Sequence, residues 1–310
     1  MAGRILVIRG GAIGDFILTL PAIRLIREAF PESHLEILGY RHILEIAAHR
    51  YYADATRSIE YGPLAGFFHP SADLDPELVQ YFSSFHQVIS YLFDPDGIFS
   101  GNLARAGVKN LIVGPGKLDD ASHATAQLAA PLVRLGLLLE DPGACVFPSS
   151  TDALAATALL PIDIGSCIAM HPGSGSAKKN WPLSRWRTLI AEVQKRLEEN
   201  PIVLVGGEAD QAQLQELQSE FGSTVRVLDS VPLPKLAAIF FRCGGFVGHD
   251  SGISHLAAAS GIPCALMFGP TDPHVWAPRN PAVHILSAQS RRMDDIALES
   301  VLAVINNWPR

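Results

Sequence analysis

A polar turn at residues 248–252, GHDSG, has the residue types and spacing of an anion-binding site. It follows a short apolar strand and precedes a helix of small residues predicted over 253–260. The first backbone N–H groups of such a helix have no partner within it, and together with the helix dipole they favour a phosphate. The alternative is that Asp250 and Ser251 cap the helix and satisfy the same donors without a ligand.

A second polar loop, HPGSGSAKKNWP at residues 171–182, combines free backbone donors with positive charge. Gly173 and Ser174 open the loop and two lysines follow, a combination that suits a diphosphate. We interpret Lys178 as a solvated surface charge. Lys179 directly precedes the turn Asn180-Trp181-Pro182, which should fix its direction.

Two further side chains are candidates for contacts with the same ligand. Glu208 ends the strand IVLVGG and could accept hydrogen bonds from a ribose hydroxyl pair. Alternatively, it complements the dipole of the next helix. His255 lies one turn into the small-residue helix and could face the phosphates, or it is a hydrogen-bonded histidine of the core.

Asp15, which follows the glycine loop at residues 10–14, is a candidate general base. A carboxylate there could take the proton of an acceptor hydroxyl within hydrogen-bond reach. The alternative, which the residue alone favours, is capping of the helix that begins at Phe16. The glycine spacing differs from the dinucleotide fingerprint GxGxxG, so a nicotinamide cofactor is not indicated.

Two DxD patterns, at residues 73–75 and 94–96, could hold a divalent metal shared with a diphosphate. Each also contains turn and helix-start residues. Helix capping explains both patterns adequately, so we expect no metal site.

Strands and helices alternate along the chain, which predicts α/β domains with parallel sheets wrapped on both faces. The predicted strands are 4–9, 35–40, 57–61, 87–93, 110–114, 167–171, 202–207, 225–228, 246–247, 264–268 and 283–287. The predicted helices are 16–30, 42–50, 75–85, 102–106, 126–139, 184–199, 209–218, 233–242, 253–260 and 294–308.

The length of 310 residues suits two domains of roughly 150 residues each. The stretch EDPGACVFPSS, residues 140–150, is the predicted link. We expect one domain at 1–145, a second at 151–290 and a C-terminal helix at 291–310. Two facing α/β domains would form a cleft in which the loops after their strands converge.

Composition excludes several classes of protein. A net charge of −7 argues against a general nucleic-acid binder. No apolar run approaches the roughly 20 residues needed to cross a bilayer, and the first residues do not resemble a secretory signal, so we expect a cytoplasmic protein. The four cysteines, Cys145, Cys167, Cys243 and Cys264, show no metal or redox spacing and are expected to be reduced and mostly buried.

Together these segments resemble glycosyltransferase family 9, the ADP-heptose:lipopolysaccharide heptosyltransferases, whose fold is the two-domain GT-B type. The segments that carry the likeness are Gly10–Ala22, His171–Pro182, Val205–Glu208 and Gly248–Pro273. They occur in both predicted domains in the family's order. Residues from about 40 to 140 carry no matching motif.

The resemblance implies that the first domain, 1–145, binds the acceptor and carries the catalytic base, Asp15, and that the second domain, 151–290, binds the nucleotide sugar. The implied donor-binding residues are Gly173, Ser174 and Lys179 in the phosphate loop, Glu208 near the ribose, Val231 on the adenine, and Asp250, Ser251, Gly252 and His255 at the diphosphate.

The implied reaction is an inverting transfer, without metal or other cofactor, of a heptose from ADP-heptose to a lipopolysaccharide core or related lipid-linked glycan at the inner membrane face. Peripheral contact of a cytoplasmic protein with that face is compatible with this. The alternatives are a family member that uses another nucleotide sugar or acceptor, a non-catalytic sugar-nucleotide-binding protein and, least favoured, a dinucleotide oxidoreductase.

Overall fold

The computed structural model describes residues 3–165, 167–197 and 201–308 and divides into two compact units. The units are Met1–Pro142 and Gly143–Arg310, so the division lies inside the stretch predicted as the link. The described part of the predicted C-terminal segment 291–310 belongs to the second unit, where its helix α12 (Leu298–Asn306) packs against α7 (Leu183–Leu197).

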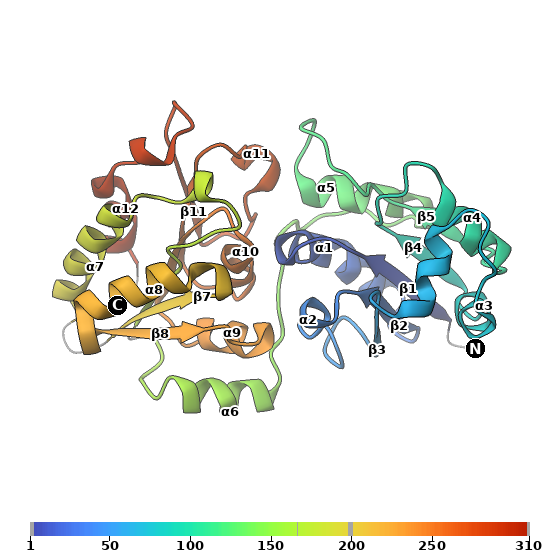
Figure 1. Ribbon diagram of the computed structural model, residues 1–310, viewed down its shortest axis with the longest axis horizontal. Coiled ribbons are helices and arrows are strands. Elements are labelled where there is room, and N and C mark those ends of the chain that lie inside the picture. Colours follow the sequence, from blue (N-terminus) through green and yellow to red (C-terminus); the bar gives the residue numbers. More distant parts are fainter. Residues whose placement is uncertain (1–2, 166, 198–200, 309–310) are drawn as a thin grey trace. The chain divides into compact units, whose positions relative to one another are not determined.

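The first unit is built on a five-stranded parallel sheet in the order β3-β2-β1-β4-β5. Its strands are β1 (Arg4–Arg9), β2 (His34–Gly39), β3 (Ala55–Ser58), β4 (Gln87–Ser90) and β5 (Leu111–Val113). Its helices are α1 (Ile13–Ala29), α2 (Arg41–Leu44), α3 (Pro76–Ser83), α4 (Ile98–Arg105) and α5 (Ala124–Ala129), with 3-10 helices η1 (Gly62–Phe68) and η2 (Ala130–Leu135) (Figure 1).

The core of this unit follows from alternation along β1. Leu6 and Ile8 point to the same face of the sheet and join a buried cluster of three rings, Phe67, Phe82 and Phe99, from η1, α3 and α4. This cluster holds η1 and α4 against the sheet next to the loops that follow its strands.

The second unit is built on a six-stranded parallel sheet in the order β11-β10-β9-β6-β7-β8. Its strands are β6 (Ile168–Met170), β7 (Ile202–Gly206), β8 (Val225–Asp229), β9 (Gly245–His249), β10 (Cys264–Phe268) and β11 (Val283–Ser287). Its other helices are α6 (Ser150–Leu159), α8 (Gln211–Phe221), α9 (Leu233–Phe240), α10 (Gly252–Ala259) and α11 (Pro273–Trp276), with 3-10 helices η3 (Ala177–Lys179), η4 (Glu208–Asp210), η5 (Gly222–Thr224) and η6 (Met293–Asp295) (Figure 1).

Both faces of this second sheet are covered by helices. Val247 of β9 points into the cluster formed with α7, α8 and α12. Its neighbour Phe246 points to the other face and packs against Phe240 of α9, with ring centroids 5.3 Å apart. The predicted doubly wound parallel sheets are therefore confirmed for each unit.

Strand order reverses beside the first strand of each sheet, between β1 and β4 and between β6 and β9. In open parallel sheets, ligands bind at this switch point, outside the carboxyl ends of the strands. The glycine loop after β1 and the polar loops after β6 and β9 all lie at such points. The predicted cleft between the domains stays a prediction.

Three helix predictions were wrong in instructive ways. The helix predicted over 126–139 stops at Ala129, because Pro131 cannot donate to an α-helical hydrogen bond, and continues as 3-10 helix η2. The helix predicted over 42–50 is reduced to α2. Helix α6 was missed, although Ser149 and Asp152 form a capping box at its start. The predicted end of α7 near Glu199 lies outside the described residues.

Within the described parts of the chain, no helix combines the length and the apolar character needed to cross a membrane. All four cysteines are free thiols; Cys167, Cys243 and Cys264 are buried and Cys145 is half-buried.

Candidate active site

Asp15 is the third residue of α1, and its carboxylate is held in two ways. Oδ2 accepts the backbone N–H of Ala12 at 2.8 Å, so Asp15 does stabilise the helix start, but from inside a helix that begins at Ile13 and not as the cap of one that begins at Phe16. Oδ1 lies 3.6 Å from Nη2 of Arg9. Gly11 makes this possible, since its φ of +94° suits glycine and a Cβ there would approach Asp15 Oδ2 to 2.8 Å. Capping and a chemical role are therefore compatible, because the side chain remains 34% exposed.

Arg9, at the end of β1, is a buried cation that the sequence did not single out. Its guanidinium donates to the carbonyls of Tyr91 and Asp15, both at 3.3 Å. Burial lowers the pKa of Arg9 from its ordinary value, and the charge of Asp15 opposes that shift. The guanidinium thus ties the ends of β1 and β4 to the first turn of α1.

Asp15 and Arg9 line a cavity of about 510 Å³ in the first unit. The cavity lies at the carboxyl ends of the strands, and residues that follow β1, β2, β3, β4 and β5 all contribute to its wall. A carboxylate at the wall of a cavity of this size could accept a proton from a bound hydroxyl compound.

In the second unit, three predicted donor-binding residues come together at the start of α10. Lys179 Nζ lies 2.6 Å from Oδ2 of Asp250, although the two residues are 71 positions apart in the chain. His255 Nε2 lies 4.0 Å from the other carboxylate oxygen, Oδ1. Asp250 is only 8% exposed, whereas the Lys179 side chain is 32% exposed and accessible to a ligand.

Ser251 and not Asp250 caps helix α10. Its Oγ accepts the backbone N–H of Ser254 at 3.2 Å, so the capping alternative holds for this one of the two residues. The helix begins at Gly252 and presents its remaining N-terminal N–H groups next to the Lys179–Asp250 ion pair. The arrangement can bind an anionic group such as a diphosphate.

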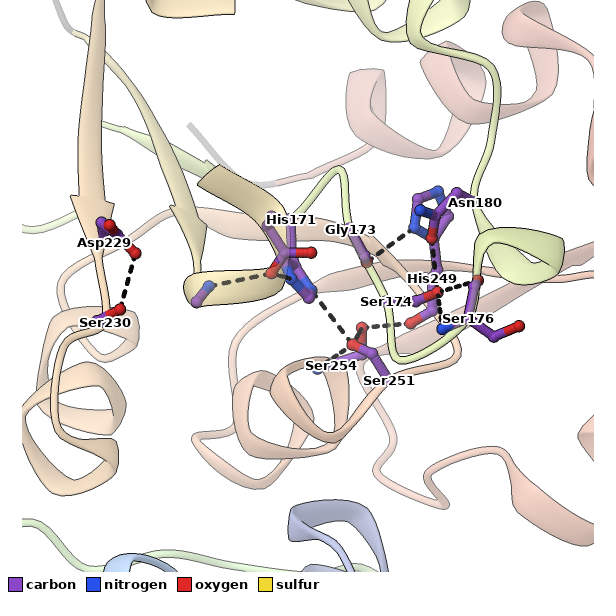
Figure 2. Close-up of polar contacts among 12 residues, drawn as sticks. His171, Gly173, Ser174, Ser176, Asn180, Asp229, Ser230, His249, Ser251 and Ser254 are labelled. Atoms are coloured by element: carbon purple, nitrogen blue, oxygen red, sulfur yellow. Dashed lines mark hydrogen bonds and ion pairs between the residues drawn. The ribbon is translucent and has the colours of Figure 1, made fainter. Parts of the chain in front are cut away.

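Behind this helix start lies a buried polar network that sequence reasoning missed. His171 Nε2 lies 3.1 Å from Asp210 Oδ2, and His171 Nδ1 lies 3.3 Å from Ser251 Oγ; Figure 2 shows the contact between His171 and Ser251. Burial tends to raise the pKa of Asp210, but hydrogen bonds from His171 and from the Gly207 N–H outweigh burial and leave that pKa below its ordinary value. The network therefore fixes the cap of α10 to the loop after β7.

His249, the last residue of β9, ties the two polar loops together. The Trp181 N–H donates to its Nε2 at 2.9 Å, so Nδ1 carries the proton and donates to the Gly173 carbonyl at 3.1 Å (Figure 2). Complete burial lowers the pKa of His249 to about 3. This histidine is thus a structural group that positions the loop carrying Lys179.

Gly173 and Ser174 shape the same loop. A Cβ on Gly173 would lie 1.7 Å from Oδ1 of Asp210, so only glycine fits. Ser174 Oγ contacts the Ser176 carbonyl at 2.7 Å and Asn180 Oδ1 at 2.6 Å (Figure 2). In this structure its hydroxyl stabilises the loop, and a contact with phosphate stays a prediction.

The two predicted nucleoside contacts follow neighbouring strands. Glu208 is exposed and begins η4 after β7, and Val231 is half-buried and follows β8. Because β7 and β8 pair in the sheet, both residues lie at its carboxyl edge. Their roles at the ribose and the adenine stay predictions.

One carboxylate of each DxD pattern caps a helix. Asp75 accepts the Leu78 N–H at 3.0 Å. Asp94 accepts the N–H groups of Phe99 and Ser100 at 3.0 and 2.9 Å. Burial tends to raise the pKa of Asp94, but these bonds and the Ser100 hydroxyl keep it below its ordinary value. The capping interpretation is confirmed for Asp75 and for Asp94.

Comparison with known proteins identifies the class to which this fold and these loops belong. Residues 148–304, about half of the chain, match the family model described as glycosyltransferase family 9 (heptosyltransferase). The chain belongs to this family, and the predicted resemblance is confirmed.

The relatives agree with this assignment. Lipopolysaccharide heptosyltransferase 1 of Escherichia coli strain K12 is 30% identical over 117 residues, which cover 37% of this chain and 35% of the relative. The protein of that name from strain RS218 matches equally well over 34% of its length. The match therefore spans about a third of these curated relatives.

Solved structures extend the likeness in fold to nearly the whole chain. The glycosyl transferase family 9 protein of Veillonella parvula DSM 2008 superposes with a TM-score of 0.80 at 19% identity, covering 98% of this chain and 96% of its own. E. coli heptosyltransferase WaaC with ADP gives 0.75 at 19% identity, covering 98% and 99%. E. coli ADP-heptose lps heptosyltransferase II gives 0.75 at 17%, covering 98% and 97%. The fold is the GT-B type, as predicted.

Proposed function

We propose that this protein transfers a heptose from ADP-heptose to a lipopolysaccharide core sugar or a related glycan, with inversion and without a metal ion. The observation that carries the proposal is the meeting of Lys179, Asp250 and His255 at the start of α10, in a chain of the heptosyltransferase family. Both the Escherichia coli relatives and two of the structural neighbours are named for heptose transfer.

In this proposal the diphosphate occupies the start of α10. Lys179 and the first N–H groups of the helix neutralise the charge that develops on the leaving ADP, which is the task a metal ion performs in other transferases. Glu208 holds the ribose and Val231 packs on the adenine. Ser251 and Gly252 bring the backbone close to the phosphates, and the Gly173–Ser174 loop closes over them.

The reaction is one displacement at the anomeric carbon. Asp15 takes the proton of the acceptor hydroxyl, the acceptor oxygen bonds to the anomeric carbon, and the bond to the ADP oxygen breaks with its electron pair leaving on ADP. The mechanism requires that Asp15 reaches the acceptor hydroxyl beside the donor sugar in the ternary complex. The proposed partner is a lipid-linked glycan at the inner face of the cytoplasmic membrane, met by a cytoplasmic protein.

Calorimetric titration of the full chain tests the donor. We expect ADP and ADP-heptose to bind, and UDP- and GDP-sugars not to bind; if no ADP ligand binds, the heptose donor is wrong. Incubation with ADP-heptose and a core oligosaccharide in EDTA should release ADP and form an inverted glycoside. ADP-heptose binding without release of ADP across an acceptor panel would instead favour a non-catalytic binding protein.

A further inference from the structure

The cavity of the first unit combines charged and exposed aromatic side chains. The wall of this cavity, whose volume is about 510 Å³, includes Asp15 and Arg9 and three exposed rings: Tyr40 follows β2, Phe68 ends η1 and Phe93 follows β4. The sequence carries no motif in this region, so only the fold brings these rings to Asp15.

Two of these aromatic rings are largely exposed, and one of them is also held by a ring contact. Phe93 is 65% exposed, the largest fraction among the Phe, Tyr and Trp residues of the described chain. Phe68 is 46% exposed and stacks on the buried Phe99, with centroids 4.9 Å apart and planes 21° from parallel. Exposed rings on a cavity wall are unfavourable in water unless a ligand covers them. The π face of such a ring carries partial negative charge and attracts the C–H hydrogens of a sugar ring.

The backbone beneath Phe93 is also fixed. A Cβ on Gly116, which follows β5, would lie 2.4 Å from the Phe93 Cα and 2.5 Å from the Leu92 carbonyl oxygen. Close approach of the two loops therefore depends on glycine, and it fixes the backbone position from which the exposed Phe93 ring extends.

The charges of the wall disfavour an anionic ligand. Among its lining residues, all within the described chain, Arg9 is the one lysine or arginine, and it is 6% exposed and already bound to Tyr91 and Asp15. Asp15 and Glu60 contribute two carboxylates. A carboxylate or phosphate on the ligand would meet this negative wall without a free cation to pair with.

We infer that this cavity binds an uncharged pyranose residue of the acceptor, a hexose or heptose whose C–H face stacks on Phe68 and Phe93 and whose reacting hydroxyl points to Asp15. The inference rests on the proposed function, because Asp15 is assigned there as the base. It adds the chemical class of the acceptor. The cavity binds neutral sugars and does not bind sugars that carry a phosphate or a carboxylate on the ring to be glycosylated.

Direct binding to the full chain tests the class of acceptor without depending on turnover. Saturation-transfer NMR in the presence of ADP would compare methyl heptoside and methyl glucoside with their phosphate monoesters and with a methyl ulosonic acid glycoside. We expect signals from the neutral glycosides, unchanged between 50 and 500 mM NaCl. Binding of the anionic sugars in preference, weakening with salt, would overturn the inference, as would binding of none.

Variants test whether the acceptor contacts the aromatic wall, by which we mean the exposed rings of Tyr40, Phe68 and Phe93. Phe93→Ala should raise the KM for the neutral acceptor about tenfold, the effect of one lost ring contact, while kcat and the Kd for ADP stay unchanged. Phe93→Tyr should restore the KM. Val113→Ala, an exposed residue of β5 that does not line the cavity, is the matched control and should have no effect. Phe68→Ala is a second test of the same contact, but it can fail to fold because Phe68 packs on Phe99. An unchanged KM in Phe93→Ala is therefore sufficient to contradict stacking of the acceptor on Phe93.

Two exposed cations next to lining residues provide the opposite test. Arg41 follows Tyr40 and Lys117 follows Gly116. The double variant Arg41→Ala, Lys117→Ala should leave the KM for neutral glycosides unchanged. If the wild type instead uses an anionic glycoside and the double variant raises the KM for that glycoside tenfold or more, the acceptor is anionic and the inference is wrong. In each experiment, titration of the same sample with ADP-heptose separates the two proposals. If the protein does not bind ADP-heptose, the proposed function is wrong. If it binds ADP-heptose and prefers anionic acceptors, only this inference is wrong.

Discussion

Asp15 is oriented before any substrate binds, because one carboxylate oxygen caps α1 and the other lies beside Arg9. Asp15→Asn keeps an oxygen for the Ala12 N–H but cannot take a proton. We therefore expect kcat to fall by at least ~100-fold, the usual scale for loss of a general base. Thermal unfolding and the Kd for ADP-heptose should stay close to wild type. Unchanged turnover in Asp15→Asn would remove this residue from the chemistry.

Lys179 and its neighbour Lys178 form a natural pair of test and control. Lys179 reaches Asp250, whereas Lys178 is exposed on the same turn of η3. Lys179→Met should weaken ADP-heptose binding at least tenfold, since a charge-assisted contact to phosphate is typically worth about 1.5–3 kcal/mol. Lys178→Met should bind like wild type. Equal dissociation constants for the two variants in calorimetry would contradict the phosphate role of Lys179.

Gly173 tests whether the buried network determines the loop. An alanine Cβ would overlap Asp210, so Gly173→Ala should lower the free energy of unfolding by about 1–3 kcal/mol, as overpacking does. Gly175→Ala is the control, because a Cβ there meets no atom within 4 Å. Urea denaturation measures both. If Asp210→Ala relieves the effect of Gly173→Ala in the double variant, steric overlap is the cause.

At the scale of elements, His249 couples the loops after β6 and β9, and this coupling predicts a pH dependence. The pKa of His249 falls from 6.5 to about 3 on folding. Between pH 6.5 and pH 3, His249 is protonated in the unfolded chain but not in the folded chain. The contribution of His249 to the free energy of unfolding is therefore fully present above pH 6.5 and is lost as the pH falls towards 3. Between pH 7 and pH 5 the free energy of unfolding should decrease by up to about 2 kcal/mol from this group.

Denaturation of two variants at both pH values separates this contribution from that of other groups. His249→Gln should show a smaller decrease than wild type, because its side chain does not titrate. His284→Gln, which removes an exposed histidine of β11, should behave like wild type. If His249→Gln keeps the full decrease, the loss of stability comes from other titrating residues.

The sequence predicts elements that depend on local pattern and misses those that depend on distant partners. Apolar runs place strands such as β1 and β10 with the observed bounds, since buried parallel strands need little more. Pro131 was overlooked within an otherwise helical pattern. His171, Asp210 and His249 were left without a role, because their contacts join residues 39 to 76 positions apart. The one local signal in the sequence was the pair of glycines at 173 and 206. In the structure, a Cβ at either position would overlap the side chain of Asp210.

The aromatic wall near Asp15 shows the same limit. Tyr40, Phe68 and Phe93 have no common spacing in the chain, and each alone is an ordinary exposed residue. They line one cavity because β3, β2, β1 and β4 are successive strands of the sheet: Tyr40 follows β2, Phe68 ends η1 after β3, and Phe93 follows β4. The proposed acceptor site therefore depends on the topology of the sheet, whereas the polar loops of the second unit could be predicted from local sequence.

At the scale of the whole molecule, the two units should respond differently to ADP. All four tryptophans, Trp181, Trp186, Trp276 and Trp308, belong to the second unit, so tryptophan fluorescence reports its unfolding. ADP at about 100 times its Kd should stabilise that unit by about 2.7 kcal/mol. In hydrogen exchange, protection should increase in 143–310 and little in 1–142. Equal increases in both units would indicate that they unfold as one cooperative body.

The ion pair between Lys179 and Asp250 has a consequence for inhibitor design. Lys179 already has a partner in this structure, so in the proposed donor site an incoming compound must outcompete a buried carboxylate for it. Donor mimics that replace the proposed pyrophosphate by a neutral linker carry no charge with which to compete and would leave the lysine paired. Compounds that keep a strong anion at this position, such as bisphosphonates, have the chemistry to draw the lysine away.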